Sequence, residues 1–443
     1  ASSVGDEWNS GEALTVTLLD QDLNLNTNND EDLYLVNTTK QSLVPSLQIG
    51  SPLSVLVAAA NVTDVTQFSK IAYYTETATD VMVGNTLNIT MATGYTGADL
   101  NSMNSSNTYF NFDFSSFTNS TNPVVAVCLH AEGIGTAHFV CETGANKGIT
   151  KVISDIGIGD ITIELQMTQD YGLGASGTGV QTILDLPFVA DVFSFGDDGT
   201  NNAIYRLELG ESDDNTGEFT GSVEYVMLNQ INKNLDATYT DLSTIDSDID
   251  IIIEQDMTDE DSPRINYFDL GADGVSTQIA DQLEAPTHSG VVSFDSDNYK
   301  IADTVVVTLN DQDMNTDSEL IDVYTTIAAG DVVGAGATLA TGLVLDITFD
   351  DEVWQDDEGA GCSAGSISGD DGLHATGFTL VETGTESGIF TGSFQVPTTF
   401  CKDSTDTAVT VTGTDIEVNY QDFRNASGES IEVGDGASIN ANT

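Results

Sequence analysis

The sequence predicts an all-β protein made of tandem immunoglobulin-like β-sandwich domains, and three observations support this prediction. A strand-and-turn pattern recurs along the 443 residues, as it does in an array of similar units. Apolar and polar residues alternate over short segments, for example from Leu14 to Leu18 and from Val305 to Leu309, which is the period of half-buried strands. Turns rich in glycine and aspartate separate these segments, and long helical periodicity is absent. Short strands at this density are typical of β-sandwiches.

Three patterns repeat along the chain. The opening strand at 8–24 aligns without gaps with 299–315. A hairpin at 211–221 aligns in the same way with 382–392. The final strand pattern is found at 160–165, 248–253 and 415–420.

These repeats predict three domains, at 1–168, 169–286 and 287–443. The first carries an insertion rich in Asn, Ser and Thr at about 85–122. The second ends in a segment, from Ile265 onward, that is expected to connect domains or to pair at a sheet edge. Each hairpin begins with a glutamate that we expect to cap its turn, namely Glu142, Glu211 and Glu382.

The charge of the chain is extreme, with 71 acidic residues against 10 basic ones and a net charge of −61. Such a field repels nucleic acid and anionic lipid and attracts cations, so we expect cations but no nucleic acid as partners. Salt adaptation or solubility alone is the alternative explanation. The clustering of acidic residues at turns and strand ends favours cation binding.

No apolar run approaches the ~18 residues needed to span a bilayer, and Ala1-Ser-Ser is typical of an end left by signal peptidase.

Cysteines and glycosylation motifs predict an extracellular location. Cys128 is close to Cys141 in the sequence, and Cys362 is close to Cys401, which predicts a disulfide within each pair. Four buried free thiols are the alternative. The chain also contains six Asn-X-Ser/Thr motifs. The predicted glycosylation sites are Asn37, Asn61, Asn88, Asn104, Asn119 and Asn425.

The two Asp-Gln-Asp-x-Asn segments that follow the opening strand are the strongest chemical signal. Oxygen ligands at every second residue converge where a strand turns, and Ca²⁺ takes six to eight such ligands. The glycine and the final glutamate of an EF-hand are missing, so we expect a loop site with Ca²⁺ or another divalent cation. A charged turn that only caps backbone amides is the alternative. Two Asp-Asp-Gly turns are weaker candidates. The predicted ligands are Asp20, Asp22, Asn24, Asp30, Asp32, Asp311, Asp313, Asn315, Asp317, Asp197, Asp198, Asp370 and Asp371.

Motifs of catalysis are absent from the sequence. It contains no His-Glu-x-x-His, no Gly-x-Ser-x-Gly and no phosphate-binding glycine loop. A carboxylate pair for glycoside hydrolysis cannot be chosen among 71 acidic residues. We therefore expect a protein that is not an enzyme.

The segments 309–315, 381–392 and 416–422 resemble archaeal surface-layer proteins, most closely those of marine ammonia-oxidising archaea. The resemblance implies strings of immunoglobulin-like domains, N-glycosylation, divalent cations and self-association into a two-dimensional lattice at the cell surface. Proteins of this kind are usually longer. The expected function is a structural subunit of an anionic extracellular layer that is permeable to small cations such as ammonium. The alternatives are a calcium-dependent adhesin or carbohydrate-binding module and, less favoured, a secreted halophilic hydrolase.

Overall fold

A computed structural model describes most of the strand-forming parts of the chain. The described residues are 8–34, 48–49, 72–74, 86–90, 108–118, 124–131, 140–151, 161–167, 186–194, 205–229, 231–232, 238, 245–253, 256–257, 262–328, 331–333, 337–338, 345–354, 372–373, 376–402 and 407–441. Their regular structure is nearly all β, which confirms the predicted all-β class. Within these residues, no helix is long and apolar enough to cross a membrane.

The first lobe combines two distant parts of the chain and is called the N-terminal lobe. Its elements are β1 (Leu14–Leu19), η1 (Gln21–Leu23), β2 (Asp32–Leu33), β3 (Gln48–Ile49), β12 (Tyr205–Leu207), β13 (Leu209–Glu211), β14 (Glu218–Met227), β15 (Ile245–Asp246), β16 (Asp248–Ile253), β17 (Arg264–Leu270) and β18 (Ser276–Gln282). One sheet has the order β1-β14-β13-β2, with β16 also paired to β14. The other has the order β15-β12-β3-β17-β18. Buried side chains of both sheets belong to one hydrophobic core.

A second lobe, the inserted lobe, is formed by the chain between β3 and β12. Its elements are β4 (Ala72–Tyr74), β5 (Thr86–Thr90), β6 (Thr108–Asp113), η3 (Ser115–Phe117), β7 (Val124–Ala131), β8 (Val140–Thr143), β9 (Lys147–Lys151), β10 (Ile161–Met167) and β11 (Leu186–Ser194). They form two sheets, β5-β10-β7-β8 and β4-β11-β6-β9. Aromatic rings fill its core, and the ring of Phe114 stacks on that of Phe188 with centroids 5.1 Å apart. Lys147 of this lobe lies 3.7 Å from Asp246 and 3.9 Å from Glu208 of the N-terminal lobe.

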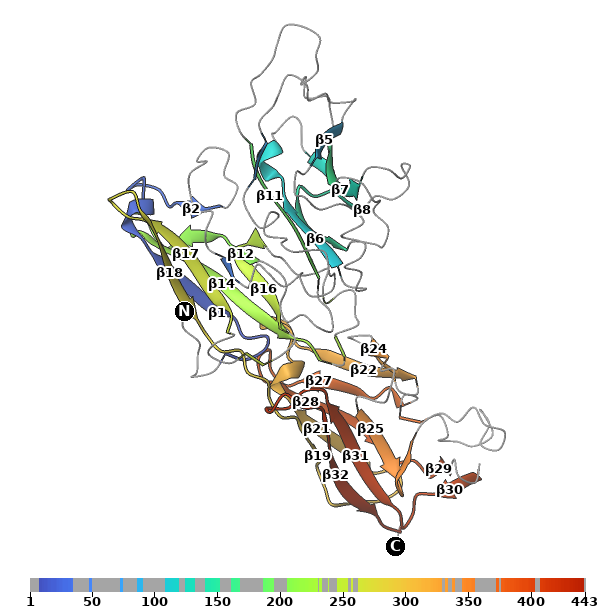
Figure 1. Cartoon of the computed structure of the whole chain (residues 1–443). Coiled ribbons are helices and arrows are strands. Elements are labelled where there is room, and N and C mark those ends of the chain that lie inside the picture. Colours follow the sequence, from blue (N-terminus) through green and yellow to red (C-terminus); the bar gives the residue numbers. More distant parts are fainter. Residues whose placement is uncertain are drawn as a thin grey trace.

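The C-terminal lobe is continuous in sequence. Its elements are β19 (Val291–Phe294), β20 (Asn298–Tyr299), β21 (Thr304–Asn310), η4 (Gln312–Met314), β22 (Val323–Ala328), β23 (Asp331–Val333), β24 (Ala337–Thr338), β25 (Leu345–Phe349), β26 (Glu352–Val353), β27 (Thr379–Glu382), β28 (Ile389–Gln395), β29 (Thr399–Lys402), β30 (Thr407–Thr410), β31 (Asp415–Asp422) and β32 (Ile431–Ile439). The two main sheets have the orders β19-β21-β28-β27-β22-β23-β24 and β20-β32-β31-β25-β26, and β29 pairs with β30. The N- and C-terminal lobes follow one another in a row, and the inserted lobe stands beside the first (Figure 1).

Four strands of the first sheet correspond between the N- and C-terminal lobes. The order β1-β14-β13-β2 corresponds to β21-β28-β27-β22. The registers agree as well, because Leu18 is opposite Phe219 and its counterpart Leu309 is opposite Phe390. The ungapped repeats in the sequence therefore correspond to equivalent positions in the two lobes.

Strand pairing crosses the domain boundary that was expected at 168/169. Strands β1 and β2, from the first expected domain, are hydrogen-bonded to β14 and β13, from the second. The segment from Ile265 onward, expected to connect domains or to pair at a sheet edge, forms the β17–β18 hairpin at the edge of the second sheet. This arrangement arises because the chain leaves the N-terminal lobe after β3, forms the inserted lobe and returns at β12.

Candidate functional site

The two Asp-Gln-Asp-x-Asn segments form the same loop at equivalent ends of two lobes. In each, the first aspartate is the N-cap of a short 3₁₀ helix, η1 or η4. One oxygen of Asp20 accepts a hydrogen bond from the N–H of Asp22 at 2.9 Å, and Asp311 does the same for Asp313 at 3.0 Å. Aspartate is a preferred cap because its carboxylate satisfies an N–H that the helix leaves unpaired.

A tyrosine from the opposite sheet binds the second oxygen of each capping aspartate. Tyr267 on β17 donates its hydroxyl hydrogen to Asp20 at 2.6 Å, and Tyr420 on β31 donates to Asp311 at the same distance. Both oxygens of each capping carboxylate thus have donors within the protein. The loop is thereby attached to both sheets of its lobe.

These tyrosines correct the sequence alignment of the final strand. The structural counterpart of β31 is β17, whereas the sequence pattern predicts that 415–420 corresponds to the segment that forms β16. Strand β16 instead runs parallel to β14 in the first sheet. The signal that identifies the true pair is Asn-Tyr-x-Asp, which is found at 266–269 and again at 419–422.

The hairpin glutamates of the N- and C-terminal lobes cap their turns, as predicted. Glu211 Oε1 accepts the N–H of Gly217 at 2.8 Å, and this bond lowers the pKa of Glu211. Glu382 Oε1 accepts the N–H of Gly388 at 3.0 Å. The role of these two carboxylates is structural, because their oxygens satisfy buried backbone donors.

The two copies of the loop lie in different environments. In the N-terminal lobe, Asp22 is exposed and Asp20 and Asn24 are half-buried. In the C-terminal lobe, Asp311, Asp313 and Asn315 are only 2%, 4% and 1% exposed. Burial raises the pKa of Asp311 to about 8, and the neighbouring charge of Asp313 adds to the shift.

The second copy is buried because it forms the junction between the N- and C-terminal lobes. Ser10 and Asn315 form a reciprocal pair: the Ser10 hydroxyl donates to the Asn315 carbonyl at 2.7 Å, and the Asn315 amide donates to the Ser10 carbonyl at 3.0 Å. Asn229 donates to the carbonyl of Asp313 at 3.0 Å. The loop is therefore used as a docking element between lobes.

Acidic groups and one histidine complete this junction. Ser318 donates from its N–H and its hydroxyl to the two oxygens of Glu224, at 2.8 and 2.6 Å. Burial raises the pKa of Glu224 to about 7 and that of Asp250 to about 6. His288, in the segment that links the lobes, contacts both oxygens of Asp313 at 2.9 and 3.0 Å. The junction thus contains groups that gain or lose protons near neutral pH.

Three exposed carboxylates converge beside the first copy of the loop. Oxygens of Asp30, Asp213 and Asp214 lie within 4.8 Å of one another, and no other such acidic, cysteine or histidine group is present in the described part of the chain. Interaction with Asp30 raises the pKa of Asp214, as expected for carboxylates held together without a cation. At the corresponding positions the C-terminal lobe has Ile321, Gly384 and Thr385.

Only Asp30 of this cluster was among the predicted ligands. Asp213 and Asp214 come from the β13–β14 turn, which contacts the loop through a hydrogen bond from the Gln21 side chain to the Thr216 carbonyl. The sequence contains the acidic pair within the repeated hairpin, but its proximity to Asp30 depends on the pairing of distant strands.

The other predicted carboxylate ligands that the structure describes do not join this cluster. Asp32 accepts a hydrogen bond from the hydroxyl of Tyr34 at 3.2 Å. Asp317 caps a turn by accepting the N–H groups of Glu319 and Leu320 at 2.7 and 3.1 Å. The remaining candidates lie outside the described residues, namely Asp197, Asp198, Asp370 and Asp371.

One predicted disulfide is confirmed. The sulfur atoms of Cys128 and Cys141 lie 2.08 Å apart, and the two residues are directly opposite on β7 and β8. Cys401 is buried on β29, whereas Cys362 lies outside the described residues, so their pairing stays a prediction.

Two of the glycosylation motifs fall in described segments. Asn88 is exposed on β5, a strand at the edge of its sheet. Asn425 forms a turn, in which its side-chain oxygen accepts the N–H groups of Ser427 and Glu429 at 2.8 and 3.0 Å. The others lie outside the described residues, namely Asn37, Asn61, Asn104 and Asn119.

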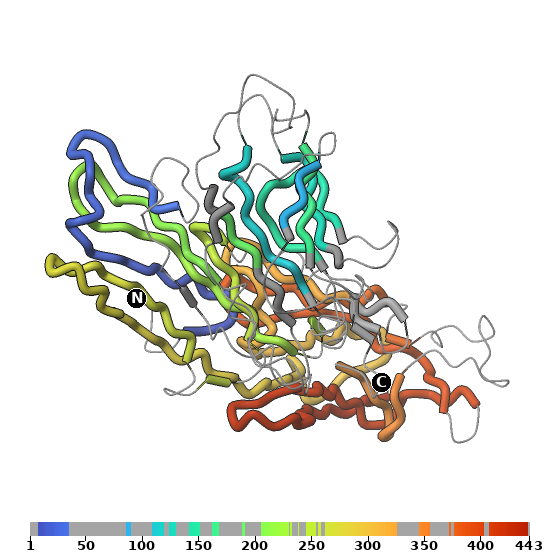
Figure 2. Tube along the Cα trace, turned by 45° about the horizontal axis from the view of Figure 1, so that its top comes forward, coloured from blue at the N-terminus to red at the C-terminus, as the bar shows by residue number. Residues whose placement is uncertain are grey.

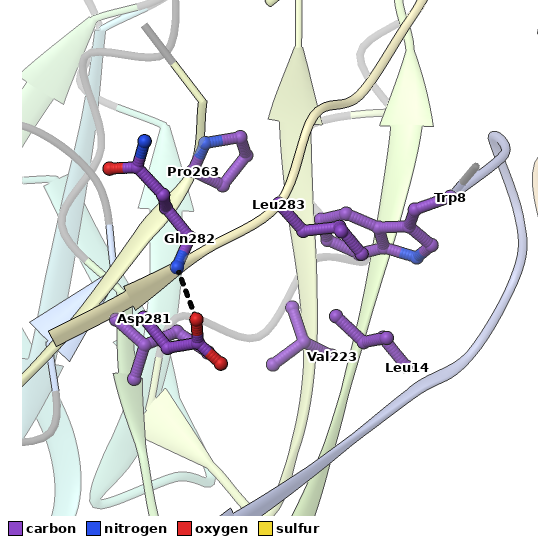
Figure 3. A pocket seen from close by; sticks show the side chains of 8 residues that line it. Trp8, Leu14, Val223, Pro263, Asp281, Gln282 and Leu283 are labelled. Atoms are coloured by element: carbon purple, nitrogen blue, oxygen red, sulfur yellow. Dashed lines mark hydrogen bonds between the residues drawn. The ribbon is translucent and has the colours of Figure 1, made fainter. Parts of the chain in front are cut away.

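An apolar pocket between the two sheets of the N-terminal lobe is a packing gap. Trp8, Leu14 and Val223 line one side together with Leu283, and Pro263 lies across from them (Figure 3). Its volume of about 10 Å³ is at the lower limit for one water molecule. A gap of this size between apolar side chains does not bind an organic ligand.

Comparison with known protein families finds no family model that matches this sequence. Comparison with curated proteins also finds no match. The function is therefore argued from the geometry of the loops and the charge of the chain.

Proposed function

We propose that this protein is a structural, non-enzymatic subunit of a self-associating and strongly anionic extracellular layer at a cell surface. In this proposal it is a glycoprotein with tandem immunoglobulin-like β-sandwich domains. Support comes from the repeats, the net charge of −61 and the resemblance of its motifs to archaeal surface-layer proteins. One observation carries the proposal. The Asp-Gln-Asp-x-Asn loop is present twice, buried at the junction in the C-terminal lobe and accessible in the N-terminal lobe.

The accessible copy lies at what we call the free end of the N-terminal lobe, formed by residues 19–31, 212–217 and 268–275. The loop after β1, the β13–β14 turn and the tip of the β17–β18 hairpin lie together there in both views (Figures 1 and 2). The equivalent end of the C-terminal lobe is covered by the N-terminal lobe through Ser10 and Asn229.

The free end also exposes large apolar side chains. Leu19 is 70% exposed, Leu25 is 56% exposed and Leu270 is 64% exposed. At the positions that correspond to Leu19 and Leu25, the C-terminal lobe has the polar residues Asn310 and Thr316. Exposed apolar groups gathered at one end favour a protein contact. We therefore propose that the free end docks against a second copy of the chain.

A divalent cation, with Ca²⁺ as the first candidate, fits the same end. Asp30, Asp213 and Asp214 supply three convergent carboxylates. The side-chain oxygen of Asn24 is buried without a hydrogen-bond partner, and the amide of the same side chain donates to Asn215, next to the cluster, at 3.1 Å. Oxygen ligands of this kind suit Ca²⁺. A bound cation would also lower the repulsion between two acidic copies.

An anionic layer would further enrich small cations such as ammonium at its openings. The enrichment depends on openings that are narrow relative to the screening length, which is about 8 Å at physiological ionic strength.

The test is the assembly state with Ca²⁺ and with chelator at one fixed, high ionic strength, measured by light scattering and electron microscopy. Sheets or oligomers are expected with Ca²⁺, and smaller species with chelator. The double variant Asp213→Asn and Asp214→Asn is expected to assemble poorly with Ca²⁺. Asp350→Asn with Asp351→Asn is the matched control, because it removes the same charge from an adjacent exposed pair elsewhere. A protein that stays monomeric with Ca²⁺ would refute the proposal.

A further inference from the structure

A polar groove crosses the outer face of the first sheet in the N-terminal lobe, where β14 changes its partner. Strand β14 pairs with β13 at Thr220 and with β16 from Ser222 onward. The groove has a volume of about 470 Å³, within the usual range for binding sites of small organic ligands. Gly221 marks the change, since a Cβ atom there would lie 2.9 Å from the Ser247 carbonyl oxygen.

Polar residues of neighbouring strands form the floor and sides of this groove. Ser222 is opposite Thr15 on one side and Asp248 on the other. Gly210 is opposite Thr220 on one side and Asp32 on the other. Because directly opposite residues share a face of the sheet, these two rows present hydroxyl and carboxylate groups side by side.

Two of the three groove carboxylates, Asp32 and Asp248, each have one oxygen engaged by a neighbouring hydroxyl, and the third, Glu208, lies 3.9 Å from Lys147. Ser222 donates to Asp248 Oδ1 at 2.7 Å, and Tyr34 donates to Asp32 Oδ2 at 3.2 Å. No hydrogen bond from the described residues reaches the second oxygen of either carboxylate. Tyr34 is 47% exposed beside them. Among the described residues that line the groove there is no lysine or arginine.

This arrangement suits an extended ligand better than a single ion. The oxygens of Asp32, Glu208 and Asp248 do not form a group within 4.8 Å, so they do not converge on one cation. The lining residues lie on β1, β2, β13, β14 and β16 or directly next to these strands. The four adjacent strands β1, β14, β13 and β2, at a spacing of ~4.8 Å, span about 14 Å. A ligand that donates several hydrogen bonds along this length matches separate carboxylate acceptors.

We propose that the groove binds a saccharide without acidic groups, with sugar hydroxyls donating to Asp32 and Asp248 and one ring lying against Tyr34. Sulfated sugars and uronic acids are excluded by repulsion, because the groove carries carboxylates and the chain has a net charge of −61. Saccharide binding does not require self-association of the chain, because the groove lies on the face of the sheet and not at the free end.

The test is binding of the full chain, kept in chelator, to an array of neutral, aminated, sulfated and uronic oligosaccharides. Binding to a subset of the neutral or aminated sugars is expected, with none to the acidic ones. The affinity for the best neutral or aminated sugar is then measured by calorimetry. Chelator removes the divalent cations that are proposed to hold copies of the chain together. The result of the saccharide-binding experiment is therefore independent of the result of the assembly experiment.

A substitution at Gly210 tests whether the groove is the site. A Cβ atom there would meet only the Asp32 side chain, at 3.7 Å, so Gly210→Val places a branched apolar side chain beside Asp32 in the groove while the fold is retained. Affinity is expected to fall at least about tenfold, the effect of losing one hydrogen bond to a charged group. Gly436→Val is the matched control, because a Cβ atom at Gly436 on β32 would have its nearest contact with a side chain, Glu417, at the same distance.

Three results would overturn the proposal. The first is an absence of binding to every sugar that lacks acidic groups. The second is equal affinity of Gly210→Val and the unchanged protein, which would place binding elsewhere. The third is binding of 1,4-diaminobutane to the groove in the absence of any saccharide binding, which would identify a site for organic cations.

Discussion

At the scale of single residues, the first aspartate of each repeated loop is a helix cap, and its carboxylate oxygens are used in hydrogen bonds within the protein. Asp20 and Asp311 each accept one backbone N–H and one tyrosine hydroxyl, so their oxygens already have donors. A spacing of oxygen-bearing residues therefore predicts where a loop turns, but it does not show which oxygens remain available for a cation.

The two tyrosines provide a matched pair of variants. Tyr420→Phe removes a donor from the buried Asp311, so we expect the C-terminal lobe to lose about 1.5–3 kcal/mol of unfolding free energy. Tyr267→Phe removes the same bond from the half-buried Asp20, and a loss of about 1 kcal/mol is expected. Urea unfolding at pH 7 measures both. Equal losses would contradict the role assigned to burial.

At the scale of elements, the buried loop makes the junction sensitive to pH. Burial raises the pKa of Asp311 to about 8 and that of Glu224 to about 7, above the ordinary value of about 4 in an unfolded chain. The folded junction holds these protons more tightly than the unfolded chain does. Its stabilisation is therefore complete below about pH 4 and is lost as the pH rises through 7 and 8.

We expect the junction to open more readily at pH 9 than at pH 6 in the absence of divalent cations. Hydrogen exchange of the backbone amides around Asp311 and Ser10, expressed relative to the intrinsic exchange rate at each pH, measures this opening. Asp311→Asn retains a capping side chain without the ionisable group, so its exchange should vary less with pH. Asp20→Asn, at the equivalent loop, serves as the control and should leave the pH dependence of the junction unchanged.

A second disulfide, between Cys362 and Cys401, is predicted from the sequence. Peptide mapping without reduction should recover Cys362 linked to Cys401, in addition to the Cys128–Cys141 link. Replacing both Cys128 and Cys141 with alanine should destabilise the inserted lobe by about 2–4 kcal/mol. A free thiol at Cys401 in the native protein would contradict the first expectation.

The period-two pattern predicted the strands well but not all of their partners. The all-β class, the repeated register of β1 with β14 and β21 with β28, and the capping glutamates follow from local sequence. The final strand was misaligned because an alternating segment such as β16 has the same pattern as β31, and periodicity does not identify a neighbour. The pairing of β1 with β14 joins segments about two hundred positions apart, which no local pattern reveals.

Local sequence also predicted only part of the candidate site. Asp30 was found because it follows the repeated loop directly. Asp213 and Asp214 were missed because their proximity to Asp30 arises from the packing of a distant hairpin turn. The saccharide groove was missed for a related reason, since its residues are ordinary strand residues that become a site only where β14 changes partner.

At the scale of the whole molecule, we propose that the free end of the N-terminal lobe is an interface between copies of the chain. The docking loop that is buried in the junction is accessible there, with Leu19 and Leu270 exposed beside it. With a net charge of −61, two copies approach closely only when cations or salt reduce their repulsion.

Sedimentation velocity over a range of protein concentrations, with Ca²⁺ and at fixed high ionic strength, tests this claim most directly. The unchanged protein should shift to larger species as its concentration rises, and Leu19→Ser with Leu270→Ser should remain monomeric. Val291→Ser with Val381→Ser, two exposed positions away from the free end, should assemble like the unchanged protein. Assembly that persists undiminished in the Leu19 and Leu270 variant, or a monomer at every concentration of the unchanged protein, would contradict the account.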